Sequence, residues 1–206
     1  AGLTDLYQKA TSGAGSDELL LKSNDPKFPA DWSSDGRFIL YRSRDPKTKE
    51  DIWVLPLEGD RQPFPLLQTE FNESQARFSP NGKWIAYTSD ESGTTQVYVQ
   101  SFPAAGSKWP VSTGGGNQPR WRRDGRELFY LADGKLMAVE VKTEGTFEAG
   151  VPKPLFVIHG PIEVTPFAIS YAVTADGQRF LVRSVVEQAS TTPITVVVNW
   201  AAEVKR

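Results

Sequence analysis

The sequence contains no cysteine and only one histidine in 206 residues. The absence of cysteine excludes disulfides, thiolate metal sites and a cysteine nucleophile. No run of about 18 apolar residues occurs, so the sequence predicts no transmembrane helix and no membrane contact by this chain itself. The formal net charge is −2, whereas dedicated nucleic-acid-binding proteins usually present a basic surface. We therefore expect no nucleic-acid partner.

Catalytic motifs are also missing. A serine hydrolase of the nucleophile-elbow type needs Gly-x-Ser-x-Gly and a histidine base. The elbow is absent, and the single histidine, His159, lies between Ile158 and Gly160. The acidic turn that begins at Asp90 lacks the alternating ligand spacing of a calcium loop. The sequence therefore predicts no catalytic residue, no cofactor and no metal site. His159 is either a loop residue that hydrogen-bonds locally or a ligand contact.

What the sequence does contain is a repeated turn. Its four copies are Trp32-Ser-Ser-Asp-Gly-Arg37, Phe78-Ser-Pro-Asn-Gly-Lys83, Trp121-Arg-Arg-Asp-Gly-Arg126 and Val173-Thr-Ala-Asp-Gly-Gln178. Their glycines are 46, 43 and 52 residues apart. Asp or Asn can bond the nearby backbone in such a turn, while glycine takes the positive φ that the turn requires. A single Asp-Gly pair would mean little, but each copy is followed by a similar apolar strand.

The copy from Gln75 to Phe102 indicates how each unit folds. Its second strand is apolar on both faces, with Trp84 on one side and Ile85 on the other, so the sheet must be covered on both sides. A third strand follows, and in the first three copies a segment with proline, which suits a sheet edge. Four-stranded units with a period in the forties are typical of propeller blades. We predict an all-β fold, a β-propeller of about four four-stranded antiparallel blades.

The repeats divide a single domain that covers residues 1–206. We expect blades at about 28–70, 71–113, 114–158 and 165–200, preceded by an N-terminal half blade at 4–23. Either the two ends of the chain join to complete one blade of a closed ring, or the chain is a fragment of a larger propeller, which we favour. In the second case the open blade edges would invite self-association.

The motif resembles the TolB-like β-propeller repeat. The best copy runs from Phe78 to Phe102, and the resemblance covers about residues 5–200; the third copy departs from it by replacing Ser-Pro with Arg122-Arg123, and the fourth by Val173 and Thr174-Ala175. More narrowly, the runs 69–75 and 118–125 look like the C-terminal propellers of bacterial serine/threonine protein kinases. This resemblance implies a sensor-like propeller after a kinase domain and a membrane span, and an extracytoplasmic or periplasmic location for such a parent.

The candidate site residues follow from the expected blade geometry. In propellers the first strand of each blade lines the central channel, so the residues leading into the turns are candidates: Gln75, Arg77, Asn117, Gln118 and Arg120. Arg122 belongs to the densest basic cluster, which is either a solvated rim or a carboxylate- or phosphate-binding patch. Trp109 lies off the repeat pattern and is a candidate surface aromatic.

These expectations favour a non-catalytic binding or sensor module that recognises a protein, a peptide or a small ligand at the channel mouth. The alternative is the accessory or catalytic propeller of a peptidase-, esterase- or lactonase-like hydrolase, because related propellers occur in such enzymes. A purely structural assembly unit is a third possibility. The missing nucleophile elbow and the single histidine count against the hydrolase.

Overall fold

The computed structural model describes residues 4–22, 24–104, 106–159 and 169–183 of the chain. All regular secondary structure in these ranges is β-strand, and every strand pair is antiparallel. The described residues accordingly include no helix that is long and apolar enough to cross a membrane. The predicted all-β fold of four-stranded antiparallel blades is confirmed.

Three blades and two hairpins make up the described chain. Blade 1 consists of β3 (Lys27–Trp32), β4 (Phe38–Asp45), β5 (Lys49–Pro56) and β6 (Phe64–Leu67). Blade 2 consists of β7 (Glu73–Phe78), β8 (Trp84–Ser89), β9 (Gln96–Ser101) and β10 (Lys108–Pro110). Blade 3 consists of β11 (Asn117–Trp121), β12 (Glu127–Ala132), β13 (Lys135–Lys142) and β15 (Lys153–Val157), with the short β14 (Glu148–Ala149) on the end of β13. The first hairpin is β1 (Leu6–Gln8) and β2 (Glu18–Leu21), and the last is β16 (Tyr171–Val173) and β17 (Phe180–Val182).

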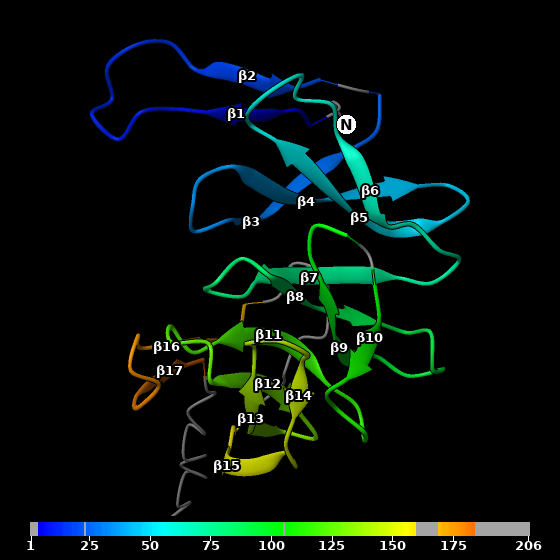
Figure 1. Cartoon of the computed structure of the whole chain (residues 1–206), viewed down its shortest axis with the longest axis vertical. Coiled ribbons are helices and arrows are strands. Elements are labelled where there is room, and N and C mark those ends of the chain that lie inside the picture. Colours follow the sequence, from blue (N-terminus) through cyan, green and yellow to red (C-terminus); the bar gives the residue numbers. More distant parts are fainter. Residues whose placement is uncertain (1–3, 23, 105, 160–168, 184–206) are drawn as a thin grey trace, which may run out of the picture.

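The sheets follow one another in chain order, from the first hairpin at one end to blade 3 at the other (Figure 1). A separate apolar core fills each of the four spaces between successive sheets. Leu40 and Ile85 meet between blades 1 and 2, whereas Trp84 and Leu128 meet between blades 2 and 3. Since neighbouring residues of β8 enter different cores, both faces of this strand are buried, as its sequence predicts.

The repeated turns of blades 1 and 2 and of the last hairpin close by the same set of bonds. In blade 2 the Asn81 Oδ1 accepts hydrogen bonds from the Ser79 hydroxyl (2.7 Å) and the Lys83 N–H (3.1 Å). The Gly82 N–H donates to the Ser79 carbonyl at 2.9 Å, with Gly82 at φ +67°. Asp35 and Asp176 accept the corresponding hydrogen bonds, from a hydroxyl and a backbone N–H, in their own turns. The Asx side chain and the left-handed glycine therefore define the turn together.

The proline-bearing segments of the first three units lie at sheet edges. Pro65 is in β6, Pro110 in β10 and Pro154 in β15, and each of these strands pairs on one side only among the described residues. Proline is tolerated there because an edge residue has no ladder bond to donate on its outer side. The third strand expected for the last unit, at 194–200, lies outside the described residues, as does most of the expected blade at 165–200.

Candidate functional site

The first strands of the three blades carry the same irregularity. Pairing with the second strand shifts between Pro29 and Asp31 in β3, between Ser74 and Arg77 in β7, and between Asn117 and Arg120 in β11. A bulge of this kind redirects the side chains that follow it. The first strands also lie next to one another, because β7 contacts both β3 and β11. Residues at the bulges are therefore gathered where the blades converge.

Gln75 and Gln118 occupy the bulges of β7 and β11, with φ of +56° and +55°. The Gln118 N–H donates to the Gln75 Oε1 at 2.7 Å, and the Ser170 N–H donates to the Gln118 Oε1 at the same distance. Gln118 also donates from Nε2 to the Ser170 hydroxyl (3.1 Å) and is only 1% exposed. Each glutamine thus holds the first strand of the next sheet. Gln118 leaves almost no surface for a ligand.

Asp31, Arg77 and Arg120 are equivalent residues of the three first strands, each directly before the aromatic residue that opens the turn. All three are half-buried. Arg77 Nη1 donates to the carbonyls of Ala30 and Ala76, and Arg120 Nη1 donates to the Pro119 carbonyl at 3.0 Å. The bond from Arg77 to Ala30 crosses from blade 2 to blade 1. Backbone acceptors therefore fix one end of each guanidinium.

The three charges influence one another. Burial and the positive charge of Arg120 together lower the pKa of Arg77 to about 10, although Asp31 opposes the shift. Burial likewise lowers the pKa of Arg120. The pKa of Asp31 is raised by burial, although the Phe78 N–H donates to its Oδ2 at 2.9 Å and both arginines favour its charged form. The site is thus a partly desolvated cluster with two positive groups and one acid.

A small pocket of ≈ 240 Å³ is lined by this cluster together with Trp32, Phe78 and Trp121. Trp32 is 48% exposed, and the Trp121 Nε1 donates to the Arg77 carbonyl at 3.2 Å. Apolar rings beside fixed polar groups are the usual composition of a small-molecule or side-chain pocket. The arrangement can hold a small polar group against aromatic walls.

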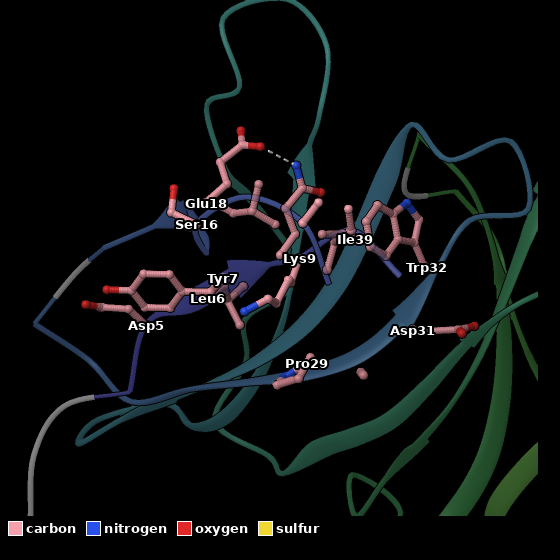
Figure 2. Close-up of a pocket in the computed structure, with 15 residues that line it drawn as sticks. Asp5, Leu6, Tyr7, Lys9, Ser16, Glu18, Pro29, Asp31, Trp32 and Ile39 are labelled. Atoms are coloured by element: carbon pink, nitrogen blue, oxygen red, sulfur yellow. Dashed lines mark hydrogen bonds between the residues drawn. The ribbon is translucent and has the colours of Figure 1, made fainter. Parts of the chain in front are cut away.

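A larger groove of ≈ 940 Å³ adjoins this pocket, because Asp31 and Trp32 line both. It lies between the first hairpin and β3. Figure 2 shows Trp32 beside Ile39 toward one end of the groove and Tyr7 toward the other, with Asp31 beyond Trp32. A ligand that fills the small pocket can therefore extend along β3 toward the hairpin.

The other predicted residues lie in different surroundings. Arg122 binds Asp124 through Nε and Nη2, both at 2.7 Å, and Glu127 through Nη1 at 2.5 Å. Its guanidinium is therefore occupied by carboxylates of its own turn. Trp109 is half-buried and packs on Trp84, with ring centroids 5.3 Å apart.

Asn117 and His159 also lie apart from the pocket. Asn117 is buried at the start of β11, and His159 is exposed two residues after the end of β15. Of the eight predicted residues, only Arg77 and Arg120 line the pocket. Gln75 and Gln118 support it from the adjoining bulges.

Asp31 was missed by the reasoning from sequence, although a signal was present. Aligning the repeats on their turns places Asp31 at the position of Arg77 and Arg120. An acid at a position that carries arginine in the next two units is the change that should have marked it. Among the described residues no group of three or more His, Cys, Asp or Glu side chains could hold a metal ion.

A second pair of acids lies in the seam between blades 1 and 2. Asp51 and Glu73 are 0% and 1% exposed. Thr48 donates its hydroxyl to Asp51 (2.6 Å), and Thr69 donates its hydroxyl to Glu73 (2.5 Å). Burial raises the pKa of both, that of Glu73 to about 7, with the charge of Asp51 adding to the shift.

This acid pair does not recur in the described seam between blades 2 and 3. At the seam between blades 2 and 3 the equivalent positions carry Gln96 and Gly116, so the neighbouring seam holds a neutral amide where this one holds two titratable groups. Burial disfavours the charged form of a carboxyl and so raises the pKa of both Asp51 and Glu73, at positions where the neighbouring seam carries neutral residues.

No protein-family model and no curated protein sequence matches the chain. Solved structures do resemble it. TolB from Acinetobacter baumannii matches with a TM-score of 0.59 and 18% identity over 84% of this chain and 41% of that chain. A puromycin-hydrolysing peptidase from Mycobacterium tuberculosis matches with a TM-score of 0.59 and 18% identity over 81% of this chain and 30% of that chain.

An oligogalacturonate lyase in complex with manganese matches with a TM-score of 0.58 and 14% identity over 82% of this chain and 48% of that chain. This chain thus spans less than half the length of each of these three proteins. At such low identity the similarities show the fold and not the activity. The fold is a β-propeller of the kind found in TolB and in several enzymes.

Proposed function

We propose that this propeller is a non-catalytic binding module, and that its protein, peptide or small-molecule ligand contacts the convergent ends of the first strands. One observation carries the proposal: Arg77 and Arg120, from neighbouring blades, line the same aromatic-walled pocket. A packed core does not need two half-buried arginines beside each other, since desolvation and mutual repulsion both oppose this placement. Such unfavourable placement is typical of binding sites.

The scaffold supports this role because the binding side chains stand on strands and not on loops. Gln75 and Gln118 fix the first strands against one another, and the Arg77 guanidinium is held by the Ala30 carbonyl of blade 1. A preorganised site loses little conformational entropy when the ligand arrives. The sequence resemblance to kinase-attached propellers would make the module an extracytoplasmic sensor, and this assignment stays a prediction.

An NMR screen tests the proposal. The ¹H–¹⁵N spectrum of the labelled protein is recorded with a library of small fragments and tripeptides. We expect the shifted amides to cluster at the pocket, around residues 30–34, 76–80 and 119–122. Hits that cluster elsewhere, or no hits, would contradict the proposal. The competing hydrolase function predicts turnover of a chromogenic ester or peptide panel that is abolished by His159→Ala, and we expect no turnover.

A further inference from the structure

The side chains that line the small pocket carry more positive than negative charge. Arg77 and Arg120 are both half-buried, and Asp31 is the only acid among the pocket-lining residues. Within the described ranges neither arginine has a carboxylate oxygen within 4.0 Å of a guanidinium nitrogen. With both arginines charged and Asp31 ionised, the pocket has a net charge of about +1. An anion with one negative charge would neutralise it.

The hydrogen bonds of the two arginines leave the same edge of each guanidinium available. An arginine has five N–H donors. Among the described residues, the hydrogen bonds of Arg77 and Arg120 use Nη1 alone, on the carbonyls of Ala30, Ala76 and Pro119. Nε and Nη2 therefore donate to no protein acceptor in the described part of the chain. Together these two atoms form the fork that binds both oxygens of a carboxylate.

Arg122 differs from Arg77 and Arg120 because a carboxylate of the protein occupies its Nε–Nη2 edge. Arg122 presents Nε and Nη2 to the two oxygens of Asp124, each at 2.7 Å. Arg37 likewise donates from Nε to its own turn aspartate, Asp35, at 2.7 Å. Both of these arginines lie in turns and are satisfied internally. Arg77 and Arg120 lie one position before the turns, and no carboxylate in the described part of the chain binds them in this way.

We propose that Arg77 and Arg120 together bind the carboxylate of a monoanionic ligand, and that the rest of this ligand extends past Trp32 into the groove along β3. The inference rests on the proposed binding function and adds the chemical class of the ligand. A carboxylate fits better than a phosphate, because Asp31 lines the same pocket and repels a second negative charge. The ≈ 240 Å³ pocket holds the anionic end, and the ≈ 940 Å³ groove provides apolar surface from Trp32 and Ile39.

The groove gives the ligand an extended shape. It is lined by consecutive residues of β3, Pro29 to Trp32, and by the facing residues of the first hairpin. A short peptide that ends in a free carboxylate has the required combination of a planar anion, a narrow backbone and apolar side chains. Amidation of its C-terminus removes the anion and preserves the rest of the molecule, so it isolates the contribution of the arginine pair.

The experiment compares acetyl-Ala-Leu-Phe with a free C-terminus and the same peptide as an amide, using ¹H–¹⁵N NMR titration at constant ionic strength. Inorganic phosphate and acetate are titrated separately. The variants are Arg77→Met, Arg120→Met and Arg120→Lys, and Arg126→Met is the control that removes an equal charge from an exposed turn. Each variant is first checked for a wild-type spectrum outside the pocket, because Arg77 also joins two blades. Arg120→Lys keeps the charge but loses the fork.

We expect the acid peptide to shift the amides of the pocket, and binding to weaken about tenfold or more in each Met variant and in the amide. Arg120→Lys should weaken it as well, whereas Arg126→Met should not. If acid and amide bind equally at this face and the Met variants bind as the wild type does, the carboxylate proposal is wrong and the binding function stands. Tighter binding of phosphate than of acetate also overturns it. If no probe binds this face, both proposals fail.

Discussion

The Gln75 Oε1 accepts a hydrogen bond from the Gln118 N–H at 2.7 Å, and so joins the bulge of blade 2 to the bulge of blade 3. Gln118 repeats the contact on Ser170, the equivalent residue of the last hairpin. The same residue type at the same repeat position therefore makes the same bond to the following sheet. This relay sets the spacing of the first strands, and with it the position of Arg77 relative to Arg120.

The glutamine relay predicts a stability loss on truncation. Gln118→Ala removes the acceptor of the Ser170 N–H and leaves this buried group without its partner. We expect the free energy of unfolding to fall by about 1–3 kcal/mol. Urea denaturation followed by tryptophan fluorescence measures it. Gln178→Ala, at an exposed turn, serves as the control and should change stability by less than about 0.5 kcal/mol. Equal effects of the two variants would contradict the relay.

The acid pair predicts a pH-dependent stability. Burial raises the pKa of Glu73 from 4.5 to about 7 in the folded protein. Between these values the unfolded chain loses the proton while the folded protein keeps it, so stability must fall as the pH rises from about 4.5 to 7 and stay low above it. Glu73→Gln keeps a neutral side chain and removes this loss. We expect the variant to be more stable than the wild type by about 2 kcal/mol at pH 8.

Thermal unfolding of the wild type and Glu73→Gln across pH 4 to 8 makes this comparison. The stability advantage of Glu73→Gln over the wild type should shrink steadily as the pH falls below 7. Asp51→Asn should act in the same direction, because burial also raises the pKa of Asp51. Parallel stability curves for the wild type and Glu73→Gln would show that Glu73 does not hold a proton in the seam.

The turn glycines predict that two Gly→Ala variants lose different amounts of folding stability. Gly82 and Gly177 both have a positive φ, of +67° and +72°. A Cβ at Gly82 would meet nothing within 4 Å, whereas one at Gly177 would lie 2.6 Å from the Cδ of Arg122. We expect Gly82→Ala to cost about 1 kcal/mol through backbone strain alone, and Gly177→Ala to cost more. Chemical denaturation of both variants checks the order, and the reverse order would contradict the packing of Arg122 against the last hairpin.

The hydrogen bonds between Arg122 and Asp124 predict that the pKa of Asp124 changes when Arg122 is replaced. Its hydrogen bonds lower the pKa of Asp124 to about 2. Arg122→Met removes them, so the Asp124 pKa should rise toward its usual value near 3.8. A carbon-detected NMR titration of the aspartate carboxyls measures this change directly. The same variant should leave acetate binding intact, because this arginine is already occupied. An unchanged Asp124 pKa in this variant would mean that Arg122 does not bind the Asp124 carboxylate.

Much of the fold could be predicted from the sequence, because the residue patterns that specify its turns, strands and sheet edges are local. The Asp/Asn-Gly turns specify positive φ by residue type, and the double-faced apolar strands such as 84–89 require sheets on both sides. The edge positions followed from proline in the same way. These features depend on a few neighbouring residues and recur in each unit, so the repeat itself corroborates them.

The site could be predicted only in part. The position of Arg77 and Arg120 on the first strands was enough to select them, but Gln75 and Gln118 were selected by the same rule and serve to join the blades. Their positive φ at a bulge depends on the strands that flank them, which the sequence does not display. Trp109 likewise finds its partner Phe147 in the neighbouring blade, 38 residues further along the chain.

Arg77 and Arg120 each offer a carboxylate an Nε–Nη2 edge that no described protein group occupies, and the arginine side chains report its binding most directly. The Nε–Hε resonances of the ¹⁵N-labelled wild type are followed while chloride is replaced by acetate at constant ionic strength, with assignments from single Arg→Lys variants. We predict saturable shifts for Arg77 and Arg120 and almost none for Arg37 and Arg122, whose Nε atoms already bind Asp35 and Asp124. Equal shifts for all four arginines, or none for Arg77 and Arg120, would contradict the account.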